Sequence, residues 1–233
     1  GGKRKLGYDS MQELSGLFYN EKIPEDMKKH AVDRYLDFPR HLGAKITKAQ
    51  FILPSDNAAQ TRMQSLLEKY HLENKKFIAV NPVAYWETKL WDDEKFARLA
   101  DLIKTKLTME VVFTGSAKES IEKITARMQT KAVNLAGETT LPQLAYLYQK
   151  ALLLVTTDSG PMHLAAAVGT PVVALFGPTD PQRTGPYGEG HTVIRTDLPC
   201  SPCLRKECPT TKCMQDILPE QVLAAIEEKS RGL

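Results

Sequence analysis

The sequence lacks any long apolar run. None of its hydrophobic stretches approaches the roughly 18 residues that a membrane-spanning helix needs, and no signal-peptide pattern opens the chain. We therefore expect a cytoplasmic protein rather than a helical membrane protein.

An excess of one charge is also lacking. Lys and Arg number 31 against 28 Asp and Glu, which leaves a net charge of +3. This balance is too weak to favour a nucleic-acid partner. No internal repeat or low-complexity segment is present, which argues against a solenoid or a disordered chain. With 233 residues, 42% of them hydrophobic, the chain is long enough for one large or two small globular domains.

Cysteine is scarce and confined to one stretch. The four cysteines follow the pattern Cys200-x2-Cys203-x4-Cys208-x4-Cys213. A reducing cytoplasm disfavours structural disulfides, whereas four thiolates could complete one tetrahedral zinc shell. The spacing differs from the paired C-x2-C motifs of a zinc ribbon, so packed thiols or an oxidised pair remain as alternatives. Because this stretch is far along the chain from the phosphate-binding motifs described below, we expect it to have a structural role.

Alternating strand and helix patterns occupy most of the chain. Apolar runs of strand length are found at residues 77–81, 109–114, 151–155 and 171–176. Helical periodicity marks residues 24–42, 58–69, 93–105, 117–128, 141–149, 161–168 and 219–229. Continuous apolar strands separated by helices predict an α/β fold with a Rossmann-like, doubly wound parallel sheet.

The stretch that follows the third of these apolar strands is the most informative. Asp158 ends the strand, Ser159 is placed to cap the next helix, and Pro161 fits its first position. Gly160 permits close approach of a ligand to the backbone. A helix start at the carboxyl edge of a parallel sheet attracts anions, so we expect a phosphate-bearing ligand there. The same residues could also serve as an ordinary structural cap.

A second polar loop ends the next strand. Thr179 and Asp180 follow residues 171–176 and are expected on the same sheet edge as Asp158. Two polar loops would then converge on one crevice.

Several motifs together resemble one known family. The run DSGPMHLAAAVGTPVVALFGPTDP at residues 158–181 resembles the donor-site signature of glycosyltransferase family 9, which includes the ADP-heptose:lipopolysaccharide heptosyltransferases. Further matches are NPVA at residues 81–84, WETKLW at 86–91, FTGS at 113–116, NLAG at 134–137 and the cysteine stretch. The resemblance extends from about residue 7 to the end of the chain.

The resemblance implies a GT-B fold of two facing Rossmann-like domains. Residues 1–53 would be a remnant of the N-terminal acceptor domain with its connector, and residues 54–233 would be the C-terminal donor domain. The N-terminal domain would then be incomplete. The family's catalytic base would lie in the missing part, so the chain alone is expected to be inactive.

The implied activity is transfer of a heptose from ADP-L-glycero-D-manno-heptose to the lipopolysaccharide inner core, with inversion and without a cofactor for catalysis. The partners would be ADP-heptose, the inner-core acceptor and the missing N-terminal domain. Arg205, Lys206 and Lys212 suit an acidic acceptor or peripheral contact with the inner membrane, although a solvated loop is the alternative. Two other functions remain open: a sugar-nucleotide epimerase of GT-B architecture and a non-catalytic nucleotide-binding module.

The resemblance also assigns site residues. Lys89 would stabilise the departing diphosphate and Asp158 would bind the donor sugar, and both are the expected catalytic residues. The other expected donor-binding residues are Ala84, Glu119, Thr139, Ser159, Gly160, Pro161, Met162 and His163. The structural alternatives are a solvated lysine, a packed histidine and helix caps. Val83 departs from the family's usual glycine, which puts close approach of phosphate to that loop in doubt.

Overall fold

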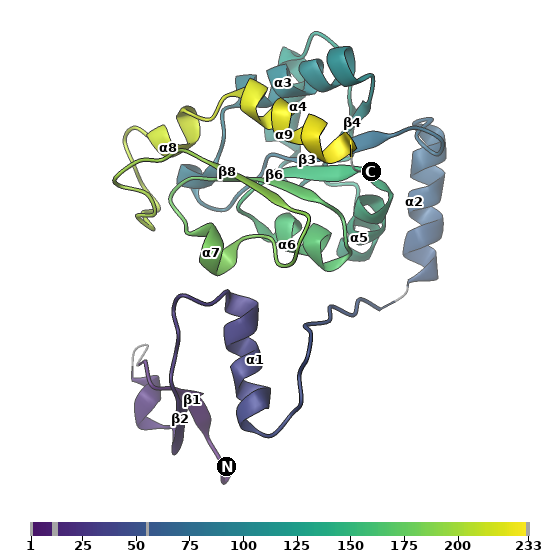
Figure 1. Cartoon of the computed structure of the whole chain (residues 1–233). Coiled ribbons are helices and arrows are strands. Elements are labelled where there is room, and N and C mark those ends of the chain that lie inside the picture. Colours follow the sequence, from purple (N-terminus) through teal and green to yellow (C-terminus); the bar gives the residue numbers. More distant parts are fainter. Residues whose placement is uncertain (1, 11–13, 55, 232–233) are drawn as a thin grey trace.

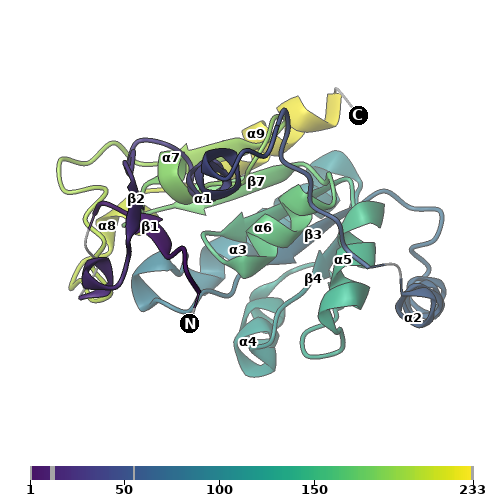
Figure 2. The same cartoon turned by 90° about the horizontal axis from the view of Figure 1, so that it is seen from below.

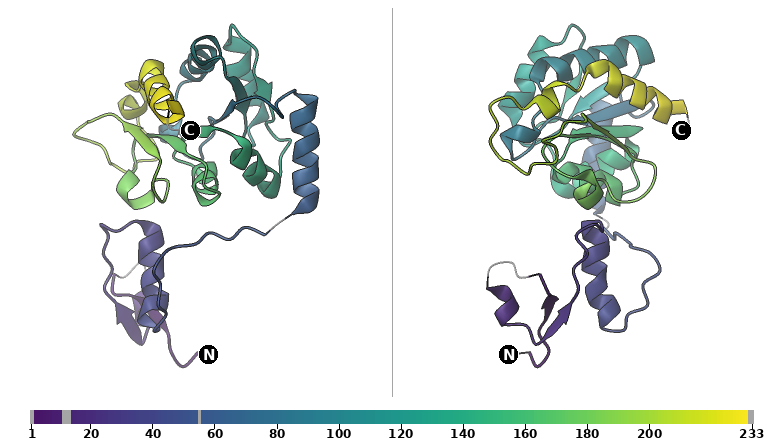
Figure 3. Two further views of the ribbon diagram at one scale, coloured as in Figure 1. Left: turned by 45° about the vertical axis from the view of Figure 1, so that its right-hand side comes forward. Right: turned by 60° about the vertical axis from the view of Figure 1, so that its left-hand side comes forward.

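The computed structural model describes residues 2–10, 14–54 and 56–231. Figure 1 shows a small N-terminal unit and a larger unit built around one sheet. An extended connector runs between them, from the end of α1 to the start of α2 (Figures 1 and 3).

The larger unit contains a six-stranded parallel sheet of order β5-β4-β3-β6-β7-β8. Its strands are β3 (Phe77–Asn81), β4 (Glu110–Phe113), β5 (Val133–Asn134), β6 (Leu153–Thr157), β7 (Val172–Phe176) and β8 (Thr192–Arg195). The chain builds outward from β3 to β5, returns to β6 beside β3, and then builds outward on the other side. The boundary between β3 and β6 is therefore a topological switch point, where ligands of open α/β sheets bind.

Helices cover both faces of this sheet, which explains why its central strands are buried throughout. Along β3, Ile78 and Val80 pack in the cluster formed with α3 (Asp93–Leu102), α4 (Lys118–Arg127) and α9 (Pro219–Arg231). Phe77 and Ala79 pack on the opposite side, in the cluster that includes α2 (Asn57–Lys69), α5 (Leu141–Lys150) and α6 (Gly160–Ala167). Successive side chains of β3 thus point to opposite faces of the sheet and pack against the two layers of helices seen in Figure 1.

The N-terminal unit consists of a parallel strand pair, β1 (Leu6–Tyr8) and β2 (Glu21–Ile23), and the helix α1 (Ala31–His41). Seen from below in Figure 2, α1 lies against the short helix α7 (Pro181–Thr184). Side-chain contacts join the units beside α7. Tyr187 Oη donates to Asp33 Oδ1 at 2.7 Å, and His30 Nε2 lies 3.0 Å from the carbonyl oxygen of Gly185.

The predicted doubly wound parallel sheet is confirmed. The helix expected at residues 24–42 begins only at Ala31, because the preceding residues form turns and the His30 ring caps the helix by accepting from Val32 N at 3.1 Å. Short elements that were not predicted include β2, α7 and α8 (Lys212–Gln215). No helix in the described ranges is long and apolar enough to cross a membrane.

Candidate functional site

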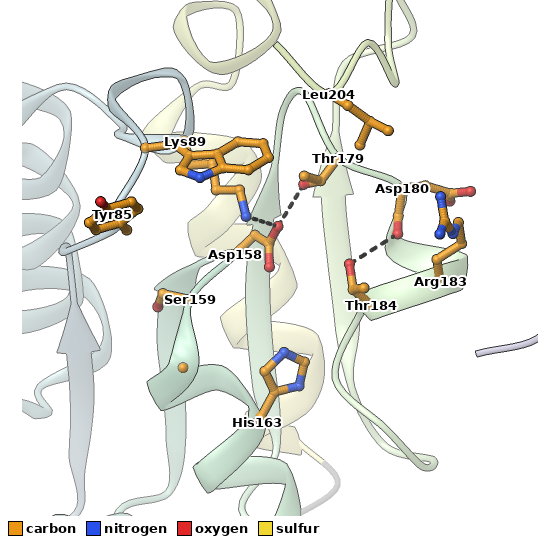
Figure 4. Close-up of a pocket in the computed structure, with 12 residues that line it drawn as sticks. Tyr85, Lys89, Asp158, Ser159, His163, Thr179, Asp180, Arg183, Thr184 and Leu204 are labelled. Atoms are coloured by element: carbon orange, nitrogen blue, oxygen red, sulfur yellow. Dashed lines mark hydrogen bonds and ion pairs between the residues drawn. The ribbon is translucent and has the colours of Figure 1, made fainter. Parts of the chain in front are cut away.

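Two cavities open at the carboxyl edge of the sheet, on either side of the start of α6. The first, which we call the α7 cavity, has a volume of about 520 Å³ and is lined by Tyr85, Trp86, Lys89, Asp158, Ser159, Gly160, His163, Thr179, Asp180, Arg183, Thr184 and Leu204 (Figure 4). The second, the α5 cavity, has a volume of about 530 Å³ and is lined by Asn81, Val83, Ala84, Tyr85, Gly115, Ser116, Gly137, Thr139, Thr140, Leu141, Leu144, Ser159, Gly160 and Pro161. Tyr85, Ser159 and Gly160 line both, so the two cavities meet at the helix start.

An ion pair forms the centre of the α7 cavity. Lys89 Nζ lies 2.7 Å from Asp158 Oδ2, and Thr179 Oγ1 donates to the same oxygen at 2.6 Å (Figure 4). The side chains of Lys89 and Asp158 are 16% and 7% exposed, so the pair is largely removed from water. The ammonium also lies 4.5 Å from the ring centroid of Trp86. Burial, the carboxylate and the ring together hold Lys89 in one position.

The start of α6 leaves backbone groups available to a ligand. Ser159 is the N-cap residue, as predicted, but its hydroxyl makes no capping bond. It bonds instead toward Thr156 Oγ1 and the carbonyl oxygen of Thr157, both at 3.3 Å. Pro161 is the second helical residue rather than the first, because the helix begins at Gly160. A Cβ built on Gly160 would meet nothing within 4 Å, so this glycine faces open space. These features fit an anion site at the N-terminus of α6.

A buried polar network supports the floor of the α5 cavity. Asn81 Nδ2 donates to the carbonyl oxygen of Thr114 at 3.1 Å, and Asn81 Oδ1 accepts from Val83 N at 3.2 Å. Thr114 Oγ1 lies 3.1 Å from Tyr148 Oη. Gly115 has φ +140°, and a Cβ there would lie 2.9 Å from Val83 Cγ2. The side chain of Val83 thus occupies space that Gly115 leaves free, and the loop keeps its form without a glycine at residue 83.

Replacing Tyr148 with phenylalanine should lower the free energy of unfolding by about 1 kcal/mol at pH 8, because one buried hydrogen bond is lost. Burial raises the pKa of Tyr148 to about 12. In the unfolded chain a tyrosine ionises near pH 10. The contribution of neutral Tyr148 to the free energy of unfolding is therefore complete below about pH 10 and is lost as the pH rises to about 12. Denaturant unfolding at several pH values should show the difference between the two proteins shrinking over that interval. Tyr85→Phe is the matched control, since Tyr85 is 96% exposed.

His163 lies in α6 and faces the α7 cavity. Burial by the surrounding wall lowers its pKa, Asp158 raises it, and the neighbouring His30 and Lys89 lower it further. The net shift is downward, so the ring is neutral near pH 7. A neutral imidazole can accept a hydrogen bond from a ligand hydroxyl or donate one to a phosphate oxygen.

Most of the predicted site residues line these two cavities. Lys89, Asp158 and His163 line the α7 cavity, and Ala84, Thr139 and Pro161 line the α5 cavity, while Ser159 and Gly160 belong to both. Met162 lies in the core below the helix start. Glu119 is exposed in the first turn of α4 and lines neither cavity, so its predicted part in donor binding has no support from this geometry.

Several lining residues were not predicted, and no local sequence signal marks them. Tyr85, Arg183, Thr184 and Leu204 reach the α7 cavity through the paths of loops and of a four-residue helix. Thr179 was expected only on the same sheet edge as Asp158, and the structure shows the hydrogen bond between them.

The cysteine stretch, although far along the chain from the phosphate-binding motifs, lies beside them in the structure. Thr88 Oγ1 donates to the carbonyl oxygen of Arg205 at 2.8 Å, beside Lys89. The carbonyl oxygen of Pro178 accepts from Cys203 N at 3.0 Å and from Leu204 N at 2.8 Å. These bonds fold the stretch back over the crevice and make Leu204 part of the wall of the α7 cavity.

The cysteines themselves are four free thiols. In the part of the chain that the structure describes, no three His, Cys, Asp or Glu residues are arranged to hold a metal ion. The present form of this loop therefore does not fit the predicted zinc site. Hydrogen bonds from the backbone of Thr210 and Thr211 lower the pKa of the exposed Cys208 thiol, whereas burial raises that of Cys213.

Comparisons with known proteins agree with this geometry. The model of glycosyltransferase family 9 (heptosyltransferase) matches residues 1–214. Lipooligosaccharide heptosyltransferase 2 of Campylobacter jejuni is 35% identical over 157 residues, which are 64% of this chain and 49% of that protein. The chain spans about half the length of the curated relatives it matches.

Two solved structures are also similar. A family 9 glycosyltransferase from Veillonella parvula aligns with a TM-score of 0.82 and 27% identity, covering 93% of this chain and 64% of that one. The ADP-heptose lipopolysaccharide heptosyltransferase II of Escherichia coli aligns with a TM-score of 0.75 and 26% identity, covering 99% of this chain and 70% of that one. These likenesses confirm the predicted GT-B type of fold. Because the family model covers most of its length, the chain belongs to glycosyltransferase family 9 (heptosyltransferase).

Proposed function

We propose that this chain binds the nucleotide-sugar donor of a glycosyltransferase that moves a heptose from ADP-L-glycero-D-manno-heptose to the inner core of lipopolysaccharide. The observation that carries the proposal is the pair of cavities that meet at Ser159 and Gly160. A nucleotide sugar has a matching form, because its nucleoside and its sugar are two bulky ends joined by a diphosphate. The diphosphate corresponds to the junction of the two cavities, where the start of α6 and Lys89 offer positive charge.

The donor would lie across this junction. Adenosine would occupy the α5 cavity, beside Ala84 and Thr139. The diphosphate would contact the N-terminus of α6 and Lys89, and the heptose would occupy the α7 cavity, where Asp158 and Thr179 can bind its hydroxyls. The volume of each cavity falls within the range of small-molecule sites.

The chemistry is displacement at the anomeric carbon with inversion. As the bond from that carbon to the diphosphate oxygen breaks, negative charge grows on ADP, and a fixed ammonium stabilises that charge more than it stabilises the ground state. An acceptor hydroxyl attacks from the opposite side and gives its proton to a base. We propose that this base lies outside this chain, as the family resemblance implies, and that Asp158 does not serve as the base because it is engaged with Lys89 and Thr179.

The relatives support this substrate. The curated relatives are named as heptosyltransferases of lipopolysaccharide or lipooligosaccharide. The name of the Escherichia coli structure identifies ADP-heptose as its donor.

Titration of the chain with ADP, AMP and adenosine by calorimetry tests the placement of the donor. We expect one ADP per chain and successively weaker binding of AMP and adenosine, because each lost phosphate removes charge from the helix start and Lys89. Equal affinity for the three compounds would place the nucleotide elsewhere. No binding of ADP would contradict the proposed function itself.

The predicted structural zinc remains a prediction. A bound metal would require the loop from Cys200 to Cys213 to rearrange so that its thiolates converge. Elemental analysis of protein purified without chelator should then give close to one zinc per chain, whereas four titratable thiols and no metal would contradict it. Since Leu204 lines the α7 cavity, we expect any such rearrangement to alter donor affinity.

A further inference from the structure

Arg183 is a cation in the wall of the α7 cavity whose side chain has no partner among the described residues. Its Nε is buried and has no hydrogen-bond partner, and its side chain forms no ion pair among the residues that the structure describes. The carboxylate of Asp180, on the same short helix, caps α7 by accepting from Gln182 N at 2.9 Å. A guanidinium nitrogen that is buried without a partner is costly, so an anion from outside the chain that bonds to the Arg183 side chain would be favoured.

Two other cations near this space already have a carboxylate partner. Lys89 is bound to Asp158 at 2.7 Å. On the N-terminal unit, Arg34 forms an ion pair with Glu25. A smaller cavity of about 230 Å³, lined by Glu25 and Arg34 on one side, reaches Arg183 on the other. Arg183 therefore stands where the α7 cavity meets the space between the two units.

The position of Arg183 separates it from the proposed phosphate site. Figure 4 shows Ser159 and Tyr85 on one side of the α7 cavity and Arg183 on the other, with Asp158 and Thr179 between them. Ser159 and Tyr85 border the α5 cavity, where the nucleotide is placed. An anion at Arg183 would therefore belong to the molecule that meets the donor sugar, not to the donor diphosphate.

We propose that Arg183 binds a carboxylate of an acidic sugar acceptor and so selects the acceptor, an inference that rests on the proposed function. The planar guanidinium offers parallel N–H groups that match the two oxygens of a carboxylate. The contact would place the acceptor on the side of the heptose opposite ADP, as in-line attack requires. Arg183 is then a binding residue for specificity and not a participant in bond breaking.

The test compares two forms of one acceptor in the presence of saturating ADP. The full chain is titrated with a heptose-free acceptor oligosaccharide that carries carboxylates and with the same oligosaccharide after reduction of its carboxyl groups. The wild-type chain should bind the acidic form about 10- to 100-fold more tightly, as expected for a charge-assisted pair. Arg183→Gln should lose this preference while keeping its ADP affinity and melting temperature. Arg62→Gln, which removes an exposed arginine from α2, should keep the preference.

Three results would overturn the inference. They are an unchanged preference in Arg183→Gln, no preference in the wild-type chain, and a loss of ADP affinity in Arg183→Gln. The last result would assign Arg183 to the donor phosphates. Failure of the proposed function would be seen separately, as absence of ADP binding by the wild-type chain.

Discussion

Replacing Lys89 with methionine should weaken ADP binding by about 10- to 100-fold. The ammonium belongs to a residue that lines the α7 cavity, and a hydrogen bond from a charged group contributes about 1.5–3 kcal/mol. Methionine keeps an unbranched stem, so packing beside Trp86 is largely preserved. Calorimetric titration with ADP measures the effect. Lys131→Met, at an exposed position before β5, is the matched control and should bind ADP normally.

The same substitution should also destabilise the fold, and this effect must be separated from binding. Without Lys89, the carboxylate of Asp158 is left 7% exposed and without its cation. Orphaning one member of a buried ion pair costs about 3–5 kcal/mol, and the bond from Thr179 should offset part of that cost. The double variant Lys89→Met/Asp158→Asn should therefore recover stability but not ADP affinity. ADP binding of wild-type strength in Lys89→Met would remove Lys89 from the donor site.

The architecture was predictable because burial leaves a strong pattern in the sequence. A parallel strand covered on both faces is apolar along most of its length, as residues 77–80 and Val172–Phe176 are, and such runs are visible without a structure. The position of Asp158 was predictable for the same reason, since a polar residue that ends a buried run lies at the sheet edge. The strand β2 has only three residues, too few to show a period.

The contacts between distant segments could not be predicted in the same way. Lys89 and Asp158 belong to different loops, and only the register of β3 beside β6 brings those loops together. Leu204 lines the α7 cavity because backbone hydrogen bonds join its loop to Pro178. Such bonds do not require particular residue types, so the sequence does not reveal them. The four cysteines left a metal site, packed thiols and an oxidised pair as alternatives, and nothing in their spacing indicated that Leu204 between them lines the α7 cavity.

Introducing an acidic side chain at Gly160 should abolish ADP binding while leaving the fold intact. Gly160→Asp places a carboxylate in the open space at the junction of the cavities, because a Cβ there meets no atom within 4 Å. At a separation of about 5 Å and an effective dielectric constant of about 20, each unit of phosphate charge would be repelled by about 3 kcal/mol. We therefore expect ADP affinity to fall by at least about 100-fold. The free energy of unfolding should stay level or rise slightly, since an acidic residue in the first turn of a helix is favourable by about 0.3–1 kcal/mol.

Two further variants make this result specific to the site. Gly160→Ala adds a methyl group without charge and should weaken ADP binding less than Gly160→Asp does, because it narrows the junction without repelling phosphate. Ser120→Asp adds the same charge to the exposed first turn of α4, away from both cavities, and should leave ADP affinity unchanged. Calorimetry gives the affinities and thermal unfolding gives the stabilities. If Gly160→Asp folds normally and binds ADP as tightly as the wild-type chain, the diphosphate does not lie at the start of α6, and the two cavities do not hold one nucleotide sugar.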